Sequence, residues 1–345
     1  MNKYAYVTGG ADRYCLALTE LLRGAGHEVR WLSTASESNV EREGAFVPPR
    51  PSRTFWNRAA AAAIDRELRG FGPDLVHCHK LYPHLSVAVV VHAARVGVPI
   101  VQTAHDYEFC SAERSGALHK RAVEALLFPI KRRLHVPRVA RFVAPSEFVA
   151  HALLDAGIDS TVVRHFVASQ SFPPLAFEDR SGVVFAGRLV PEKGVEDVLR
   201  LAERLPELRV TVAGSGPLEA RVRATPVRYL GHVGHGDVLE ELGRARVAIV
   251  PSSWAEPAGL VALEAMAAGT PVVGYETGGL AQYVSAAGGV VVPGLDAMHG
   301  AVANLHADAA EWQRRSTAGL EAVRSQFTPE RHLAELEGVY RSVLG

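Results

Sequence analysis

The sequence predicts an α/β protein with two domains, each built around a parallel sheet. Apolar, strand-like runs alternate with helix-like segments along the chain, which is typical of parallel α/β sheets. At 345 residues the chain is long for a single domain. A polar, proline-containing stretch at 168–175 separates two series of strands and helices. We therefore expect one domain over residues 1–167 and a second over residues 176–328.

The composition narrows the class of protein. A hydrophobic content of 48% and a charged content of 21% are ordinary for a globular protein. The formal net charge is zero, which argues against a nucleic-acid partner. Three cysteines are too few for a disulfide framework, and no apolar leader or membrane-spanning run is evident. We therefore expect a cytoplasmic protein.

The N-terminal half opens with a candidate strand and a glycine turn. Residues 4–8 form a possible short first strand. Gly9 and Gly10 then begin an amphipathic helix that runs through Arg23, and residues 28–32 form the next strand. A glycine pair before a helix lets backbone amides approach a ligand, although such a pair is also typical of an ordinary turn.

Two further strands, 74–79 and 100–106, each end at or beside a histidine. The surrounding residues raise the question of a zinc site: His77, Cys78, His79, His84, His105 and Cys110. His77 and His79 point to one face of a strand, however, and Cys78 points to the other. Neither a C-x-x-C nor an H-E-x-x-H spacing is present. We therefore predict no metal site.

Basic residues concentrate in residues 120–141. Between residues 113 and 141 there are two acidic and eight basic side chains, the latter being Arg114, Lys120, Arg121, Lys131, Arg132, Arg133, Arg138 and Arg141. With interspersed apolar side chains, this region could rest on an anionic membrane as a peripheral contact. It could equally be a solvated helix face near an anionic soluble acceptor. Pro129 and Pro137, which we expect to interrupt the helix, favour the solvated face.

The C-terminal half carries two cations beside a glycine-bounded turn. Residues 183–186 read as a buried strand, followed by a turn from Gly187 to Gly194 that includes Arg188 and Lys193. At the carboxyl end of a parallel strand, two fixed cations can neutralise a diphosphate without a metal. Taken alone, the same two residues are ordinary surface charges. A second strand, at 210–213, runs into a turn that contains Gly214 and Gly216.

Two carboxylates flank a predicted loop-to-helix junction. Pro257 biases Glu256 away from helix, whereas residues 261–268 are rich in helix formers, so the helix should begin near Gly259. Its first amides make an anion site that a diphosphate would fit. Glu264 lies just over one turn into this helix. Both carboxylates could accept hydrogen bonds from sugar hydroxyls, or both could be solvated.

Together these residues resemble the nucleotide-sugar-dependent glycosyltransferases of GT-B fold, specifically the retaining enzymes of family 4. The similar motifs occupy residues 187–194, 212–216 and 251–273. Gln282 departs from the pattern, because the family often has an acidic residue there. The resemblance implies two Rossmann-like domains facing each other across a cleft, with a terminal helix over residues 329–345 that crosses back to the first domain.

The resemblance also implies roles for individual residues. Arg188 and Lys193 would hold the donor diphosphate, Glu256 the donor sugar and Glu264 the ribose. His105 would lie beside the donor sugar and, with Arg188, Lys193 and Glu256, complete the catalytic set. The remaining donor contacts would come from Gly9, Gly10, Gly187, Gly214, Gly216, His232, Val233, Ala258, Gly259 and Leu260. The acceptor side would include Asp12, His79 and Asp106.

The start of the chain has a second interpretation in the light of this family. Residues 2–6 also look like the loop that follows the first strand in many relatives, which would mean that a central strand is missing. Losing a central parallel strand would leave two sheet edges unpaired. We keep both interpretations as expectations.

The implied activity is transfer of a sugar from a nucleoside diphosphate to an acceptor hydroxyl with retained configuration. We expect front-face substitution without a metal or other cofactor, since the proposed carboxylates sit as hydroxyl acceptors rather than astride the scissile bond. UDP- or GDP-sugars are the expected donors, with a small-molecule, glycan or lipid-linked acceptor. The alternatives are a nucleotide-sugar epimerase, a phosphorylase of the same fold, or a binding protein that has lost catalysis.

Overall fold

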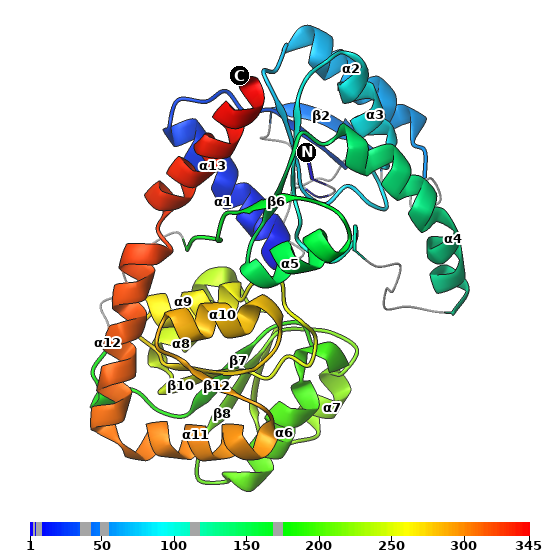
Figure 1. Cartoon of the computed structure of the whole chain (residues 1–345). Helices are drawn as coiled ribbons and strands as arrows, with labels where there is room; N and C mark the ends of the chain where they lie inside the picture. The colour runs from blue at the N-terminus through cyan, green and yellow to red at the C-terminus, as the bar shows by residue number, and fades with distance from the viewer. Residues whose placement is uncertain (3, 5–8, 35–42, 49–54, 111–117, 168–174) are drawn as a thin grey trace. The chain divides into compact units, whose positions relative to one another are not determined.

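The computed structural model describes residues 1–2, 4, 9–34, 43–48, 55–110, 118–167 and 175–345 (Figure 1). The chain divides into two compact units. Unit 1 comprises Met1–Arg164 with His332–Gly345, and unit 2 comprises His165–Arg331. Most of the predicted linker lies outside the described residues. Every described strand pair is parallel, which confirms the predicted α/β class with parallel sheets in two domains.

Unit 2 contains a six-stranded sheet in the order β12-β11-β10-β7-β8-β9. Its strands are β7 (Val183–Ala186), β8 (Val210–Ala213), β9 (Arg228–Gly231), β10 (Val247–Val250), β11 (Val272–Tyr275) and β12 (Val290–Val292). The chain therefore winds outward in one direction from β7 and in the other from β10. This reversal creates a switch point between β7 and β10, where ligands bind outside the carboxyl ends of the strands in such sheets.

Helices cover both faces of this sheet because alternate strand residues point to opposite sides. Val184 and Ala248 belong to one apolar cluster, and Val183 and Val247 belong to the other. The helical segments are η4 (Phe177–Asp179), η5 (Pro191–Lys193), α6 (Val195–Arg204), α7 (Glu219–Arg223), α8 (His235–Arg244), α9 (Leu260–Ala267), α10 (Gly278–Ala286), α11 (Leu295–Ala307) and α12 (Ala309–Gln326). As predicted, α9 begins directly after Gly259.

A buried arginine in unit 2 forms hydrogen bonds with several separate segments. Arg180 is only 1% exposed. Its guanidinium donates to the carbonyls of Leu175 (3.0 Å) and Ala268 (2.8 Å) and to Thr270 Oγ1 (2.5 Å). Its face also lies 5.1 Å from the ring centroid of Trp312. Burial lowers the pKa of Arg180 to about 10, which leaves it charged at neutral pH.

We expect Arg180→Ala to lower the free energy of unfolding of unit 2 by about 3 kcal/mol, because buried carbonyls would lose their donor. Urea denaturation followed by tryptophan fluorescence measures this, with Trp312 as a local reporter. The matched control is Arg324→Ala, which removes an exposed arginine from α12. Equal unfolding midpoints for the two variants would contradict the prediction.

Unit 1 contains a four-stranded sheet, β3-β4-β5-β6, and a two-stranded pair, β1-β2. The strands are β1 (Trp31–Thr34), β2 (Gly44–Val47), β3 (Val76–Cys78), β4 (Ile100–Thr103), β5 (Arg141–Ala144) and β6 (Ser160–Val162). The strand predicted at 28–32 instead begins at Trp31, where pairing with Gly44 starts. Residues 28–30 are thus not part of β1.

The first two residues lie between these two sheets. The N-H of Asn2 donates to Leu32 O (3.3 Å), and the N-H of His79 donates to Met1 O (2.8 Å). The N-terminal amine of Met1 also donates to His77 O. Tyr4 is not part of a strand, and residues 5–8 of the predicted first strand lie outside the described residues.

The helical segments of unit 1 are α1 (Gly10–Gly24), α2 (Arg58–Gly70), α3 (Ala88–Arg95), α4 (Leu118–His135), η3 (Val136–Arg138), α5 (Glu147–Asp155) and α13 (Pro329–Leu344). The expected interruption at Pro129 is wrong, because Pro129 lies inside α4. Burial of the following turns explains why the helix continues. Lys131 lies over the Tyr82 ring at 4.9 Å, and His135 is 1% exposed. None of the helices that the structure describes is long and apolar enough to cross a membrane.

The terminal helix α13 joins unit 1 through polar contacts. His332 meets the Tyr14 hydroxyl at 3.0 Å and the Arg164 carbonyl at 2.7 Å. The Tyr340 hydroxyl lies 2.7 Å from Nδ1 of His77. These contacts join the last helix to α1 and β3, as Figure 1 shows for the red helix beside the blue one.

Four histidines of unit 1 resist protonation. Burial lowers the pKa of His105 to about 3, of His135 to about 3 and of His332 to about 4. Burial also holds the pKa of His77 well below its usual range. In the unfolded chain each imidazole would titrate near 6.5. Below that pH the unfolded chain binds more protons than the folded unit does, so acid favours unfolding.

We expect unit 1 to lose stability as the pH falls from about 6.5 towards 4, by up to about 1.4 kcal/mol per pH unit for each of these histidines. Thermal unfolding at a series of pH values measures the slope. His135→Gln should flatten this slope, whereas the control His151→Gln, an exposed site on α5, should leave it unchanged. A melting temperature that stays constant between pH 7.5 and 5 would contradict the prediction.

Candidate functional site

The loops after β7 and β8 pack against each other without space for side chains. A Cβ on Gly214 would lie 1.8 Å from Gly187 O, and one on Gly216 would lie 2.6 Å from Leu189 O. Both glycines also have positive φ values, 143° and 155°. Gly187 N-H donates to Ala213 O at 3.0 Å, which closes the contact. These glycines are therefore needed for backbone packing at the carboxyl edge of the sheet.

A second pair of glycines joins the loops around β10. Gly194 has a φ of 71°, and a Cβ there would lie 1.9 Å from Pro251 O. Gly278 has a φ of 56°, and a Cβ there would lie 2.6 Å from Glu256 O. The N-H of Gly279 donates to the same carbonyl at 2.6 Å. The loop after β10 is thus held against the loops after β7 and β11.

This packing brings two of the predicted catalytic residues into contact. Lys193 Nζ forms an ion pair and hydrogen bond with Glu256 Oε1, and their side chains are 24% and 13% exposed. Ser252 Oγ donates to the same oxygen at 2.5 Å. Arg188 is exposed on the loop after β7. The sequence did not indicate Ser252 or the direct pairing, because both depend on how the loops fold together.

The start of α9 supplies the predicted helix terminus. Gly259 is its N-cap, and Ala258 and Leu260 flank that position. A Cβ on Gly259 would lie 2.7 Å from Leu280 Cδ1. A side chain at this position would therefore have to displace the end of Leu280.

Glu264 is the most buried of the predicted donor carboxylates, with a side chain only 7% exposed. His235 Nε2, at the first position of α8, lies 3.6 Å from Glu264 Oε1. The sequence did not identify His235 as a site residue, although it lies two positions after Val233, one of the predicted base-binding residues. Of those residues, His232 is exposed and Val233 is half-buried.

In unit 1 the predicted glycine turn caps α1. Gly9 is the N-cap, in an extended conformation that any residue adopts, and Gly10 is the first helical residue. Asp12 is 3% exposed and accepts a hydrogen bond from Asn2 Nδ2 at 2.9 Å. Its carboxylate is therefore engaged inside the unit.

The two predicted histidines meet at the carboxyl edge of the N-terminal sheet. His79 Nδ1 lies 3.0 Å from His105 Nε2. The ring of Tyr14 meets both with its edge, at centroid distances of 5.9 and 5.3 Å. Burial, the Lys80 cation and His77 lower the pKa of His105, so its imidazole is neutral at neutral pH. Asp106 lies 3.2 Å from Lys80 Nζ and accepts from Glu108 N-H at 2.9 Å.

The residues considered for zinc have different surroundings, although the rings of His77 and His79 lie close together, with centroids 4.2 Å apart. His77 contacts the Tyr340 hydroxyl and Thr103 Oγ1 through its two ring nitrogens. Cys78 is fully buried in the apolar core. Among the described residues, the potential metal ligands that do converge are Cys15, His79 and His105.

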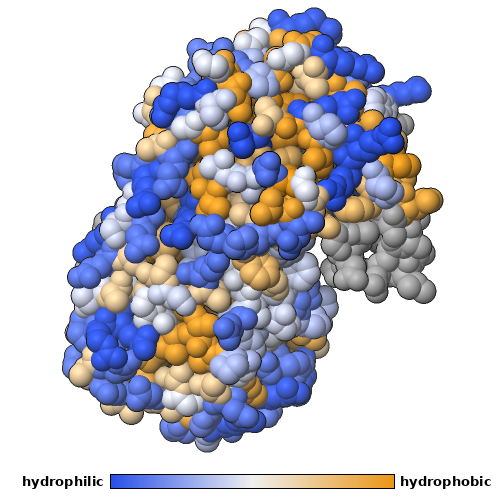
Figure 2. All heavy atoms as spheres, viewed as in Figure 1, coloured by the Kyte–Doolittle hydropathy of each residue, from blue (hydrophilic) through white to orange (hydrophobic). Residues whose placement is uncertain are grey.

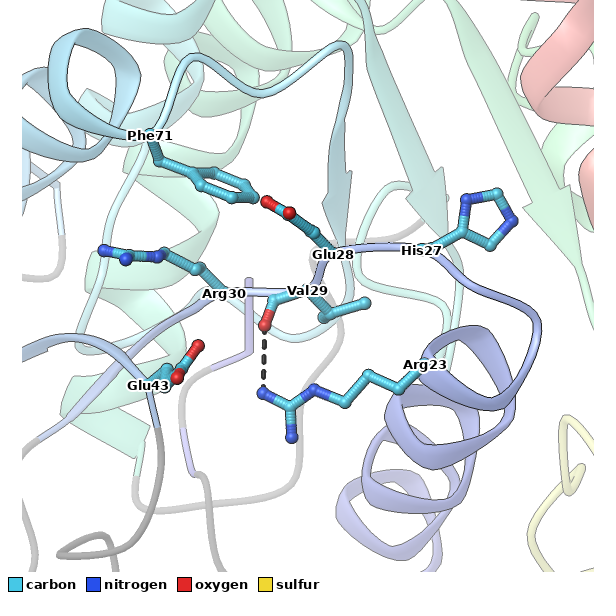
Figure 3. Close-up of a pocket in the computed structure, with 7 residues that line it drawn as sticks. All are labelled: Arg23, His27, Glu28, Val29, Arg30, Glu43 and Phe71. Carbon is cyan, nitrogen blue, oxygen red and sulfur yellow. Dashed lines mark hydrogen bonds between the residues drawn. The ribbon is translucent and has the colours of Figure 1, made fainter.

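A hollow of about 500 Å³ lies elsewhere in unit 1 (Figure 3). Its lining residues are Arg23, His27, Glu28, Val29, Arg30, Glu43 and Phe71. Arg23 donates to Val29 O at 3.0 Å, and Arg30 lies over the Phe71 ring at 5.2 Å. Both cations are thus already engaged, and no predicted site residue lines this hollow.

Two family models match adjoining parts of the chain. Glycosyltransferase Family 4 matches residues 8–170, and Glycosyl transferases group 1 matches residues 168–318. A glycogen synthase of Mycobacterium tuberculosis is 33% identical over 374 residues, covering 93% of this chain and 88% of that protein.

Solved structures share the fold over nearly the whole chain. A sucrose-phosphate synthase from Thermosynechococcus elongatus matches with a TM-score of 0.78 at 20% identity, covering 97% of this chain and 93% of that one. HepE of Anabaena, solved with UDP and glucose, matches with a TM-score of 0.70 at 15% identity, covering 99% and 98%. The GT-B fold class is thereby confirmed. From the family models and the glycogen synthase match, the chain belongs to the group 1 glycosyltransferases, family 4.

Proposed function

We propose that this glycosyltransferase moves a sugar from a nucleoside diphosphate to an acceptor hydroxyl, with retained configuration and without a metal. The observation that carries the proposal is the meeting of Lys193 and Glu256 at the switch point of the unit 2 sheet, beside the start of α9. A cation, a carboxylate and free helix amides at one sheet edge suit a diphosphate and sugar hydroxyls. UDP and GDP are the favoured carriers, and the UDP-bound HepE structure supports the former.

Lys193 forms an ion pair with Glu256. The donor diphosphate would compete for Lys193 and be held additionally by Arg188 and the amides of Ala258, Gly259 and Leu260. Glu256, still held by Ser252, would then accept hydrogen bonds from the sugar hydroxyls. Placing fixed positive charge at a developing oxyanion stabilises the transition state.

The transfer step that we propose is a front-face substitution. The bond between the anomeric carbon and the diphosphate oxygen breaks, while the acceptor oxygen bonds to the same face of that carbon. The acceptor's proton passes to the departing diphosphate oxygen, so no protein base is consumed. Glu264 would bind the ribose with His235 beside it, and His232 and Val233 would border the base.

Unit 1 would supply the remaining groups. His105, neutral at working pH, can donate or accept one hydrogen bond to the sugar but brings no charge to it. Gly9 and Gly10 would offer backbone amides. Because Asp12 is buried against Asn2, we assign the acceptor contacts to His79 and Asp106.

We expect Lys193→Ala and Glu256→Gln each to reduce turnover by about 10²-fold or more, since each removes a group that acts on the reacting centre. Calorimetry against UDP-, GDP-, ADP- and dTDP-sugars, with and without magnesium, identifies the donor, and product analysis determines the anomeric configuration. Arg200→Ala, which removes an exposed cation from α6, is the matched control and should leave turnover unchanged.

The same assay separates the alternatives. An epimerase would convert the donor without an acceptor, and a phosphorylase would require phosphate as the acceptor. Donor binding without turnover would indicate a binding protein. Near-native rates in Lys193→Ala would overturn the site assignment, and an inverted product would overturn the retaining mechanism.

We also propose that α4 contacts an anionic membrane surface. Leu126 is 72% and Ile130 46% exposed, and their spacing places them on one helix face with the exposed Arg133. Apolar side chains beside basic ones suit an anionic lipid surface. The space-filling view shows apolar patches among hydrophilic side chains on both units (Figure 2). Three free cysteines fit a cytoplasmic location.

We expect the protein to co-sediment with anionic vesicles and less with zwitterionic ones. The double variant Leu126→Ser with Ile130→Ser should weaken this binding, because both apolar contacts are removed. Leu154→Ser is the control, since Leu154 is 57% exposed on α5 instead. Equal sedimentation of both variants with anionic vesicles would contradict a contact through α4.

A further inference from the structure

Three potential metal ligands from separate elements converge in unit 1. Cys15 comes from α1, His79 follows β3, and His105 follows β4. One ligand atom of each residue lies within 4.8 Å of the other two. We propose that Cys15, His79 and His105 bind a thiophilic divalent metal such as Zn²⁺, which takes His105 out of sugar transfer and so inhibits the enzyme. The inhibitory part of this inference rests on the proposed function.

The ligand set and spacing suit zinc. Sulfur binds Zn²⁺ at about 2.3 Å and imidazole nitrogen at about 2.0 Å, so tetrahedral ligand atoms lie roughly 3.3 to 3.6 Å apart. His79 Nδ1 and His105 Nε2 are 3.0 Å apart, close to that value. Given the upper limit of 4.8 Å for the sulfur contacts, closing the site requires a shift of at most about 1.3 Å.

Binding has a defined proton balance. The Cys15 thiol must lose its proton to solvent, and the sulfur then forms a bond to the metal. The hydrogen bond between His79 and His105 must also break, because both facing nitrogens have to present lone pairs. The imidazole that donated this hydrogen bond then carries its proton on its other ring nitrogen. Both rings remain neutral throughout.

The surroundings favour an inhibitory site over a structural one. Three protein ligands leave a fourth position for water or a substrate oxygen, which is typical of open sites. Lys80 pairs with Asp106 nearby, so this carboxylate is engaged outside the triad. Metal binding would fix His105 by a bond instead of a hydrogen bond, and the donor sugar would lose that contact.

Direct metal binding is the first test, and it needs no enzyme activity. Zn²⁺ is titrated by calorimetry, and Co²⁺ is titrated while the thiolate-to-cobalt absorption is followed. We expect Cys15→Ser to weaken Zn²⁺ binding by about tenfold or more and to abolish the cobalt band. Cys110→Ser is the matched control, since Cys110 is half-buried and outside the triad, and it should behave as the unchanged protein does.

A second variant protects against a trivial failure. Circular dichroism shows whether Cys15→Ser is folded. If it is not, His79→Gln removes another ligand of the same site and should also weaken Zn²⁺ binding. Zinc binding that is unaffected in a folded Cys15 or His79 variant would overturn the proposal. Absence of any zinc binding to the unchanged protein would do the same.

Inhibition is tested separately from binding. Zn²⁺ should slow sugar transfer in the unchanged protein, a chelator should restore it, and Cys15→Ser should retain transfer with about tenfold less sensitivity to zinc. A cobalt band that depends on Cys15 in a protein without transferase activity would support the metal site and contradict the proposed function. Transfer that is insensitive to bound zinc would overturn the inhibitory role.

Discussion

The candidate donor site depends on close contacts between backbones at positions without a side chain. The loop after β7 approaches the loop after β8 at Gly214 and the loop after β10 at Gly194, where a Cβ would lie within 2 Å of a carbonyl oxygen. Such distances are far inside van der Waals contact, so any other residue would push the loops apart. The position of Lys193 beside Glu256 follows from this packing. The chemistry at the sheet edge is therefore a consequence of steric exclusion.

Charge balance also stabilises the contact between the packed loops. A lysine and a carboxylate that are both partly buried would be costly alone, and each offsets the cost of the other. Ser252 gives Glu256 a second donor, so the carboxylate does not depend on the lysine alone for a partner. Unit 1 presents the opposite case, because its histidines are kept neutral by burial.

Local sequence patterns predicted much of the structure of unit 2. The glycine turns and the start of α9 were predictable because each depends on neighbours in the chain. The partners of those glycines were not, since Gly194 meets Pro251 from a distant segment. In unit 1, Cys15 became a candidate ligand only when α1 folded against β3 and β4. The helix break expected at Pro129 failed because tertiary burial of His135 outweighs a local preference.

The contacts of α13 have a consequence for how the protein is made. Unit 2 is one continuous segment, whereas unit 1 takes its last helix from residues translated after all of unit 2. Tyr14 and His77 must therefore wait for His332 and Tyr340 until the ribosome has translated beyond unit 2. Domains generally fold as units during synthesis. Unit 2 can thus complete its sheet first, although it is encoded second, and the N-terminal core closes last.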